Sequence, residues 1–99
     1  MNFKREINKG IRLLNEKSPG WQQKVDAGHL DMGSHPRVGQ ADLLTQVFGS
    51  YDEGLTALDI YSQEAILCGF RDGMQGGAGE LTYEWKEILQ TMGHTFSGR

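Results

Sequence analysis

Apolar residues recur at helical spacing along most of this chain, and glycine, proline or serine separates the segments that carry them. The first segment runs from Phe3 to Glu16, and its apolar face consists of Phe3, Ile7, Ile11 and Leu14. This spacing predicts an amphipathic helix, and Ser18-Pro19-Gly20 predicts its end, because proline cannot continue a helix. Gly10 lies inside this helix, so we expect either a closely packed neighbour or a local weakness there.

The same periodicity predicts two short helices in the middle of the chain. The first ends at Gly49, a candidate C-cap, and its apolar face consists of Ala41, Leu44, Val47 and Phe48. Ser50 or Asp52 can cap the second, because short polar side chains accept hydrogen bonds from the free N–H groups of a first helical turn. Leu55 and Leu58 of this second helix are expected to face inward.

Two further helices are predicted toward the C-terminus. One is short, with Ser62 as its N-cap and Gly69 as its stop. The last runs from about Glu80 to Met92, and its apolar face consists of Leu81, Trp85, Ile88, Leu89 and Met92. Its outward positions are charged, which is typical of a helix that packs on a core with one face.

Three segments lack this clear periodicity. Trp21 to Leu30 predicts a short helix followed by a loop, and residues 32–39 hold turn-forming residues with no period. Between Gly73 and Gly79 four glycines follow closely on one another, which predicts a mobile segment. Loops of this kind often carry binding residues.

The pattern as a whole predicts an all-α fold: one compact domain over residues 1–99 with about four to six short helices. Residues 1–2 and 94–99 are expected to fray. A chain of 99 residues buries about two-thirds of the surface that its unfolded form exposes, so its margin of stability should be thin. Trp21 and Trp85 fall at apolar positions of helical patterns, which favours two core anchors over exposed binding residues.

Composition limits which cellular compartment and which classes of binding partner we expect. The net charge is −3, and Lys4-Arg5 is the only adjacent basic pair, so no basic stripe favours a nucleic acid as partner. Cys68 lies alone in an apolar stretch, which predicts a buried structural thiol and fits a reducing compartment. No apolar run approaches the roughly 18 residues of a membrane span, and no secretory pattern opens the chain. We therefore expect a soluble cytoplasmic protein without a membrane partner.

Six segments, in order and over most of the chain, carry a resemblance: Ile11 to Leu14, Pro19 to Trp21, Leu30 to Met32, Gln46 to Leu55, Gly69-Phe70, and Leu81 to Trp85. Together they resemble a family of small, largely uncharacterised proteins of actinobacteria and their phages. The resemblance implies a bacterial or phage origin and brings no enzymatic activity with it. Members of that family often have a Cys-x-x-Cys pair where this chain has Gly39 and Asp42, so a function of that pair is not expected here.

One group of residues suggests a metal. His29, Asp31 and His35 lie close together around the irregular loop, and imidazole with carboxylate suits zinc or another divalent ion. Their spacing matches no standard ligand pattern, which favours ordinary surface or turn residues instead. His94 joins this group only if the last helix folds back over the loop. No cofactor is expected.

Two other patterns suggest chemistry. A glycine loop before a helix, here Gly73 to Gly79, can cradle a phosphate, but this one lacks the Lys-Ser/Thr ending of a P-loop, and Glu80 follows it. A flexible linker is the better interpretation. Ser34-His35 and Ser50-Tyr51-Asp52 suggest a nucleophile, yet no Gly-x-Ser-x-Gly elbow is present. We therefore expect no enzyme.

Charge is distributed unevenly along the chain. The first helix is basic, and acidic residues dominate the second half. These residues are either solvated helix faces or a surface for a basic partner, including the basic helix of a second copy in a homo-oligomer. The favoured function is a protein-interaction module, such as a phage-encoded modulator of a host protein. The alternative is a small protein that binds or sequesters a small ligand, nucleotide or metal.

Overall fold

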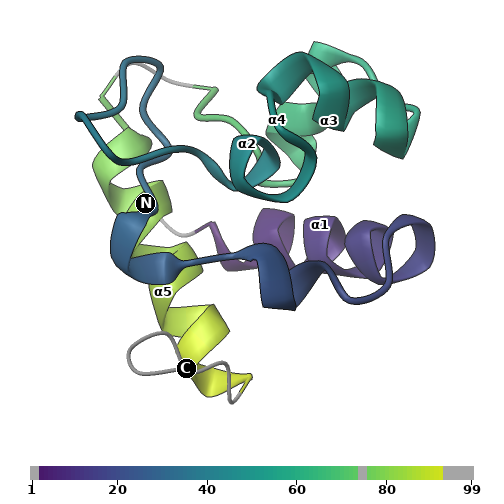
Figure 1. Ribbon diagram of the computed structural model, residues 1–99, viewed down its shortest axis with the longest axis horizontal. Coiled ribbons are helices and arrows are strands. Elements are labelled where there is room, and N and C mark those ends of the chain that lie inside the picture. Colours follow the sequence, from purple (N-terminus) through teal and green to yellow (C-terminus); the bar gives the residue numbers. More distant parts are fainter. Residues whose placement is uncertain (1–2, 74–75, 93–99) are drawn as a thin grey trace.

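Helices form nearly all the regular structure in the residues that the computed structural model describes, 3–73 and 76–92 (Figure 1). The elements are α1 (Lys4–Lys17), the 3-10 helices η1 (Trp21–Lys24) and η2 (Ala27–His29), α2 (Leu43–Phe48), α3 (Tyr51–Leu58), α4 (Ser62–Leu67) and α5 (Ala78–Thr91). In place of strands, these residues hold one isolated bridge, between Leu30 and Ala41. The predicted all-α class is confirmed. The predicted fraying at 1–2 and 94–99 lies outside the described residues.

Local differences from the predicted elements have physical reasons. The short helix expected after Trp21 is instead two 3-10 turns, η1 and η2. The N-cap of α4 is Tyr61 and not Ser62, because the Glu64 carboxylate reaches back and accepts from the Tyr61 N–H at 3.0 Å. Ser50, one of two candidates, caps α3 by accepting from the Glu53 N–H. Helix α5 begins at Ala78, two residues before the expected start.

The helices surround one cluster of buried side chains to which every helix contributes. In Figure 1, α1 lies beneath α2, α3 and α4, and α5 crosses the side of this group. Helix α1 contacts α3 and α4, and α2 contacts α3 and η1. Within the described range, no helix combines the length and the apolar character that crossing a bilayer requires.

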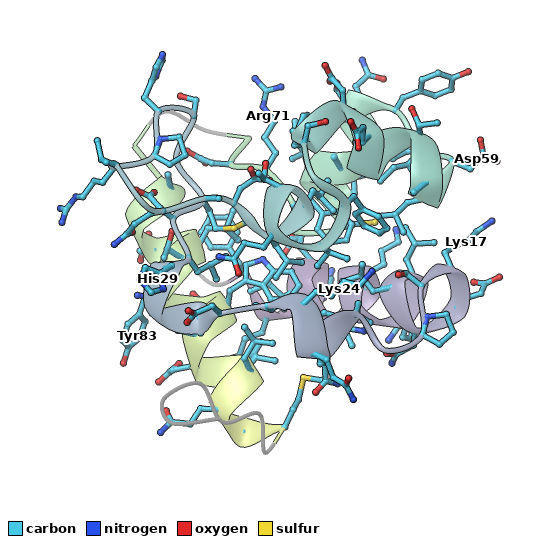
Figure 2. All side chains as sticks on the ribbon, viewed as in Figure 1. Lys17, Lys24, His29, Asp59, Arg71 and Tyr83 are labelled. Carbon is cyan, nitrogen blue, oxygen red and sulfur yellow. The ribbon has the colours of Figure 1, made fainter. Side chains whose placement is uncertain are left out.

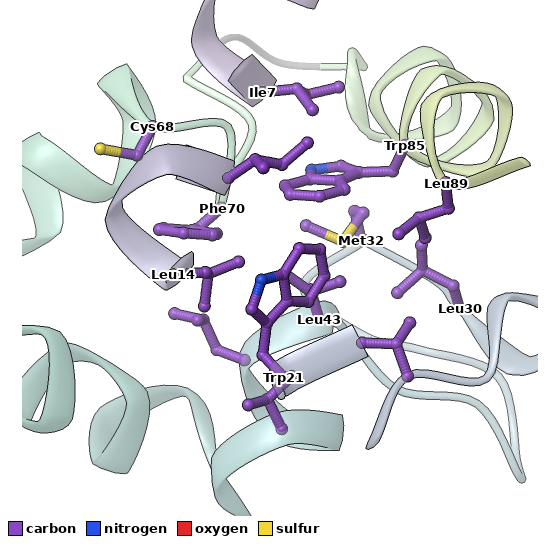
Figure 3. Packing of buried hydrophobic residues seen from close by; sticks show 14 of the residues in the cluster. Ile7, Leu14, Trp21, Leu30, Met32, Leu43, Cys68, Phe70, Trp85 and Leu89 are labelled. Carbon is purple, nitrogen blue, oxygen red and sulfur yellow. The ribbon is translucent and has the colours of Figure 1, made fainter. Parts of the chain in front are cut away.

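Trp85 lies at the centre of this cluster (Figure 3). Its ring stacks on Phe70 at 6.2 Å between centroids and meets the ring of Trp21 edge to face at 6.4 Å. Trp21 and Trp85 are 1% and 0% exposed, so the prediction that both anchor the core is confirmed. Each indole N–H has a partner: Trp21 donates to Asn15 Oδ1, and Trp85 donates to the Gly69 carbonyl.

Gly10 explains how α1 approaches the turn after α4. A Cβ atom at Gly10 would lie 2.1 Å from the Cys68 carbonyl oxygen, so only glycine fits this contact. On the other side of the contact, Gly69 adopts φ +74°, and a Cβ atom there would meet Ile7. Of the two explanations that the sequence left open for Gly10, the closely packed neighbour is the correct one.

We predict that Gly10→Ala destabilises the protein by about 1–3 kcal/mol, because the new methyl group overlaps backbone that cannot move freely. Gly79→Ala is the matched control: the space around Gly79 in α5 is open, and alanine favours helix, so stability should rise by up to about 1 kcal/mol. Urea denaturation followed by circular dichroism measures both. Equal effects of the two substitutions would contradict the close packing at Gly10.

Candidate functional site

A hollow of about 740 Å³ opens between the loop before α2 and the segment that joins α4 to α5. Its lining consists of residues 32–36 and 70–73 together with Asp42, Tyr51, Gly76 and Ala78. These include parts of both segments that the sequence singled out separately, the irregular loop and the glycine-rich segment. Their convergence makes this hollow the candidate site.

The loop on one side of the hollow is closed at its neck. Ala41 N–H donates to the His29 carbonyl and Asp31 N–H donates to the Ala41 carbonyl, both at 3.0 Å, which forms the Leu30–Ala41 bridge. Gln46 of α2 reinforces this neck. Its side-chain oxygen accepts from Asp26 N–H at 2.6 Å, and its Nε2 contacts three carbonyl oxygens, those of Asp26, His29 and Ala41.

Two further contacts shape the loop itself. Asp31 accepts from the Gly33 N–H at 2.9 Å and from the Arg37 N–H at 3.3 Å, so its carboxylate organises the turn. Met32 N–H donates to Thr82 Oγ1 at 2.9 Å, which ties the loop to α5. The loop is therefore held at its neck and again at Met32, two residues beyond the neck.

The opposite wall continues directly from the core. Phe70 is 1% exposed, and its N–H donates to the Ala65 carbonyl, so residues 70–73 leave the core in a defined direction. Asp72 then accepts from the Gly77 N–H at 2.9 Å, next to the start of α5. Asp42 has the same role at α2, where it accepts from the N–H groups of Leu44 and Thr45 and from the Thr45 hydroxyl.

Tyr51 contributes an unusual group to this lining. It is the first residue of α3, and its half-buried ring packs against the core cluster. Its hydroxyl oxygen is buried, yet no group in the described residues hydrogen bonds to it. Leaving a buried polar group without a partner costs about 1–3 kcal/mol, and such groups in folded proteins call for an explanation.

Arg71 is the second lining residue with unused capacity. Its side chain is exposed and makes no hydrogen bond or ion pair within the described part of the chain. Figure 2 shows it extending outward between the loop before α2 and helix α3. The other fully charged lining groups, Asp42 and Asp72, are both engaged with backbone N–H groups.

The three metal candidates are placed differently. His29 Nδ1 pairs with Asp26 Oδ2 at 2.6 Å on the surface, away from Arg71 in Figure 2, and it does not line the hollow. Asp31 is occupied by loop amides, and His35 lies beside Ser34 Oγ at 3.3 Å. Across the described residues, no group of three or more His, Cys, Asp or Glu is placed to hold a metal ion. His94 lies outside the described residues.

The groups named in the phosphate, nucleophile and cysteine hypotheses each have a defined place in the structure. The Gly77 amide, which a phosphate would need, already donates to Asp72. Ser50 Oγ acts as the cap of α3. Burial raises the pKa of the Cys68 thiol, with smaller effects from Lys9, which lowers it, and Glu64, which raises it. A buried thiol of this kind is protonated at neutral pH and is a poor nucleophile, as expected for a structural cysteine.

No direct signal in the sequence indicates the roles of Tyr51, Arg71 or Gln46. Tyr51 stands beside a serine in a weak nucleophile pattern, and Arg71 belongs to none of the motifs described above. Comparison with protein-family models, curated proteins and solved structures finds no match for this chain. The site is therefore interpreted from its own geometry.

We predict that Tyr51→Phe raises the free energy of unfolding by about 1 kcal/mol, because it removes a buried hydroxyl without a partner and keeps the ring. Tyr61→Phe is the control, since Tyr61 is 81% exposed and its hydroxyl is solvated, so the change should stay within about 0.5 kcal/mol. Thermal and urea unfolding measure both. A loss of stability in Tyr51→Phe would show that this hydroxyl does have a hydrogen-bond partner, such as an ordered water.

Proposed function

We propose that this protein binds a small organic molecule in the hollow between residues 32–36 and 70–73. The observation that carries the proposal is the hollow itself, which two segments far apart in the chain form together. Binding sites for small molecules are typically concave and largely formed before the ligand binds.

The size and lining of the hollow agree with this function. Binding sites for small molecules typically enclose about 300–1,000 Å³ and combine apolar walls with a few polar groups. The volume here, about 740 Å³, lies within that range. Pro36 and Ala78 supply apolar lining with accessible surface, and Ser34 and Arg71 supply exposed polar groups.

The contacts that hold the loop and Phe70 in place also favour binding over a purely structural role for the loop. The loop is fixed by the Leu30–Ala41 bridge, by Gln46 and by Thr82, and the opposite wall is fixed by Phe70 in the core. A site held in place before binding loses less conformational entropy when it takes up a ligand.

Filling the hollow tests the proposal. Ser34 lines it and is exposed, so Ser34→Trp should place an indole in the binding space and weaken binding at least tenfold. Val38 lies in the same loop, is fully exposed and does not line the hollow, which makes Val38→Trp the matched control. Ligand-observed NMR with a library of small acids, amides and alcohols measures binding to all three proteins.

Two results would contradict a binding function. One is a library in which no compound binds the wild-type protein. The other is a set of compounds that bind Ser34→Trp and Val38→Trp equally well, because those compounds would occupy some other part of the surface.

A second candidate function, the protein-interaction module favoured by the sequence, is supported by the surface of α3 and α4. From residue 38 to residue 70 the chain has five acidic residues and no Lys, Arg or His. Within this stretch Tyr61 is 81% exposed and Leu67 is 54% exposed. Exposed apolar groups among uncompensated carboxylates suit a partner segment that is both basic and apolar.

Two exposed tyrosines on different elements make this candidate testable. With the photoreactive residue benzoylphenylalanine at position 61, we expect one discrete crosslinked product in producing cells, identified by mass spectrometry as another protein or a second copy. The same residue at position 83 is the control, because Tyr83 is also exposed but lies on α5. Crosslinks of equal yield and pattern from both positions, or none from position 61, would count against the interaction surface.

A further inference from the structure

Of the acidic and arginine side chains that line the hollow, the two aspartates already accept hydrogen bonds from the protein, and the arginine makes none within the described residues. Asp42 accepts three hydrogen bonds at the start of α2, and Asp72 accepts from the Gly77 N–H at the start of α5. Arg71, which lies next to Asp72 in the chain, has no hydrogen bond or ion pair in the described residues. The lining thus presents one guanidinium that is available to a ligand.

The helix starts offset part of the charge of the two carboxylates. The first N–H groups of a helix carry partial positive charge, so a carboxylate that caps a helix is offset by the dipoles it contacts. Asp42 is in this situation as the N-cap of α2, and Asp72 accepts from the N–H of Gly77, the N-cap residue of α5. Both keep part of their negative charge, so the hollow favours a ligand of low charge that can pair with Arg71.

We infer that the ligand is an organic acid whose carboxylate pairs with Arg71 and whose apolar body packs against Pro36 and Ala78. This inference rests on the proposed function, because it assigns a chemical class to the molecule that the hollow binds. Arginine holds a carboxylate through two parallel N–H···O hydrogen bonds, which gives both charge pairing and orientation. Pro36 is exposed and Ala78 is partly exposed, so both offer apolar surface in the lining.

A phosphate fits the same guanidinium but fits its surroundings less well. At neutral pH a phosphate monoester carries a charge of about −1.5 to −2, against −1 for a carboxylate. Asp42 and Asp72 remain formally negative beside the site, so repulsion grows with the charge of the ligand. In addition, the Gly77 amide that could bind a phosphate oxygen is already used by Asp72.

Three probes of similar size separate these chemistries: phenylacetate, its neutral amide phenylacetamide, and phenyl phosphate. Titration of each into the ¹⁵N-labelled full chain is followed through the amide signals of Gly33, Gly73 and Ala78, which surround the hollow. We expect phenylacetate to shift these signals in the millimolar range typical of a fragment, and to bind at least tenfold more tightly than the other two probes.

Substitution of Arg71 identifies the group responsible. Arg71→Gln should weaken phenylacetate at least tenfold and leave phenylacetamide unchanged, and Arg71→Lys should have an intermediate effect because it keeps the charge without the paired N–H groups. Arg37→Gln is the matched control: Arg37 is exposed on the same loop but does not line the hollow, so its loss should not matter.

The outcomes distinguish the inference from the function on which it rests. Equal affinity for phenylacetate and phenylacetamide, unaffected by Arg71→Gln, would overturn the acid while leaving binding in the hollow intact. Tighter binding of phenyl phosphate would overturn the choice of a carboxylate. If none of the three probes moves the hollow signals, the inference fails, and hits from the compound library that are lost in Ser34→Trp would still support a binding function.

Discussion

The indole N–H of Trp85 donates to the Gly69 carbonyl oxygen over 2.6 Å in the interior of the protein, and this hydrogen bond joins the two halves of the fold. Because both groups are buried, losing the bond would leave a polar group without water or partner, at a cost of about 1–3 kcal/mol. The bond fixes α5 against the turn that follows α4. Phe70, the next residue, then stacks on the same indole, and residues 71–73 continue from it along the hollow.

The same turn also receives α1, which explains why glycines meet there. Gly10 and Gly69 let the backbone of α1 approach the backbone of residues 68–70 closely. Side chains at these two positions would prevent that approach. One short segment therefore connects α1, α4 and α5, and it carries one wall of the hollow. In a chain of 99 residues the core is small, and this concentration of contacts allows a rigid site without a large domain around it.

Much of the helical fold could be predicted from the sequence, because helix periodicity, caps and stops are local signals. The apolar spacing predicted the helices, and Gly10 indicated a close neighbour. The identity of the N-cap at Tyr61 was missed, since it depends on the Glu64 side chain turning back. The hollow could not be predicted, because it requires the loop before α2 to meet residues 70–73, and that meeting depends on Trp85, Gln46 and Thr82 acting over long sequence separations.

The polar residues in and beside the hollow also show why a residue type alone does not identify a ligand group. Asp31, Asp42 and Asp72 are the residue types that a search for chemistry would select, yet each accepts hydrogen bonds from backbone amides that need an acceptor. Replacing them would disturb a turn or a helix start, and a loss of binding would then report on folding. Arg71 is exposed and has no such structural partner in the described residues, so a change at this position alters the hollow while the backbone around it keeps its hydrogen bonds. Unused hydrogen-bonding capacity at an accessible group, more than residue type, therefore marks the groups that are available to a ligand.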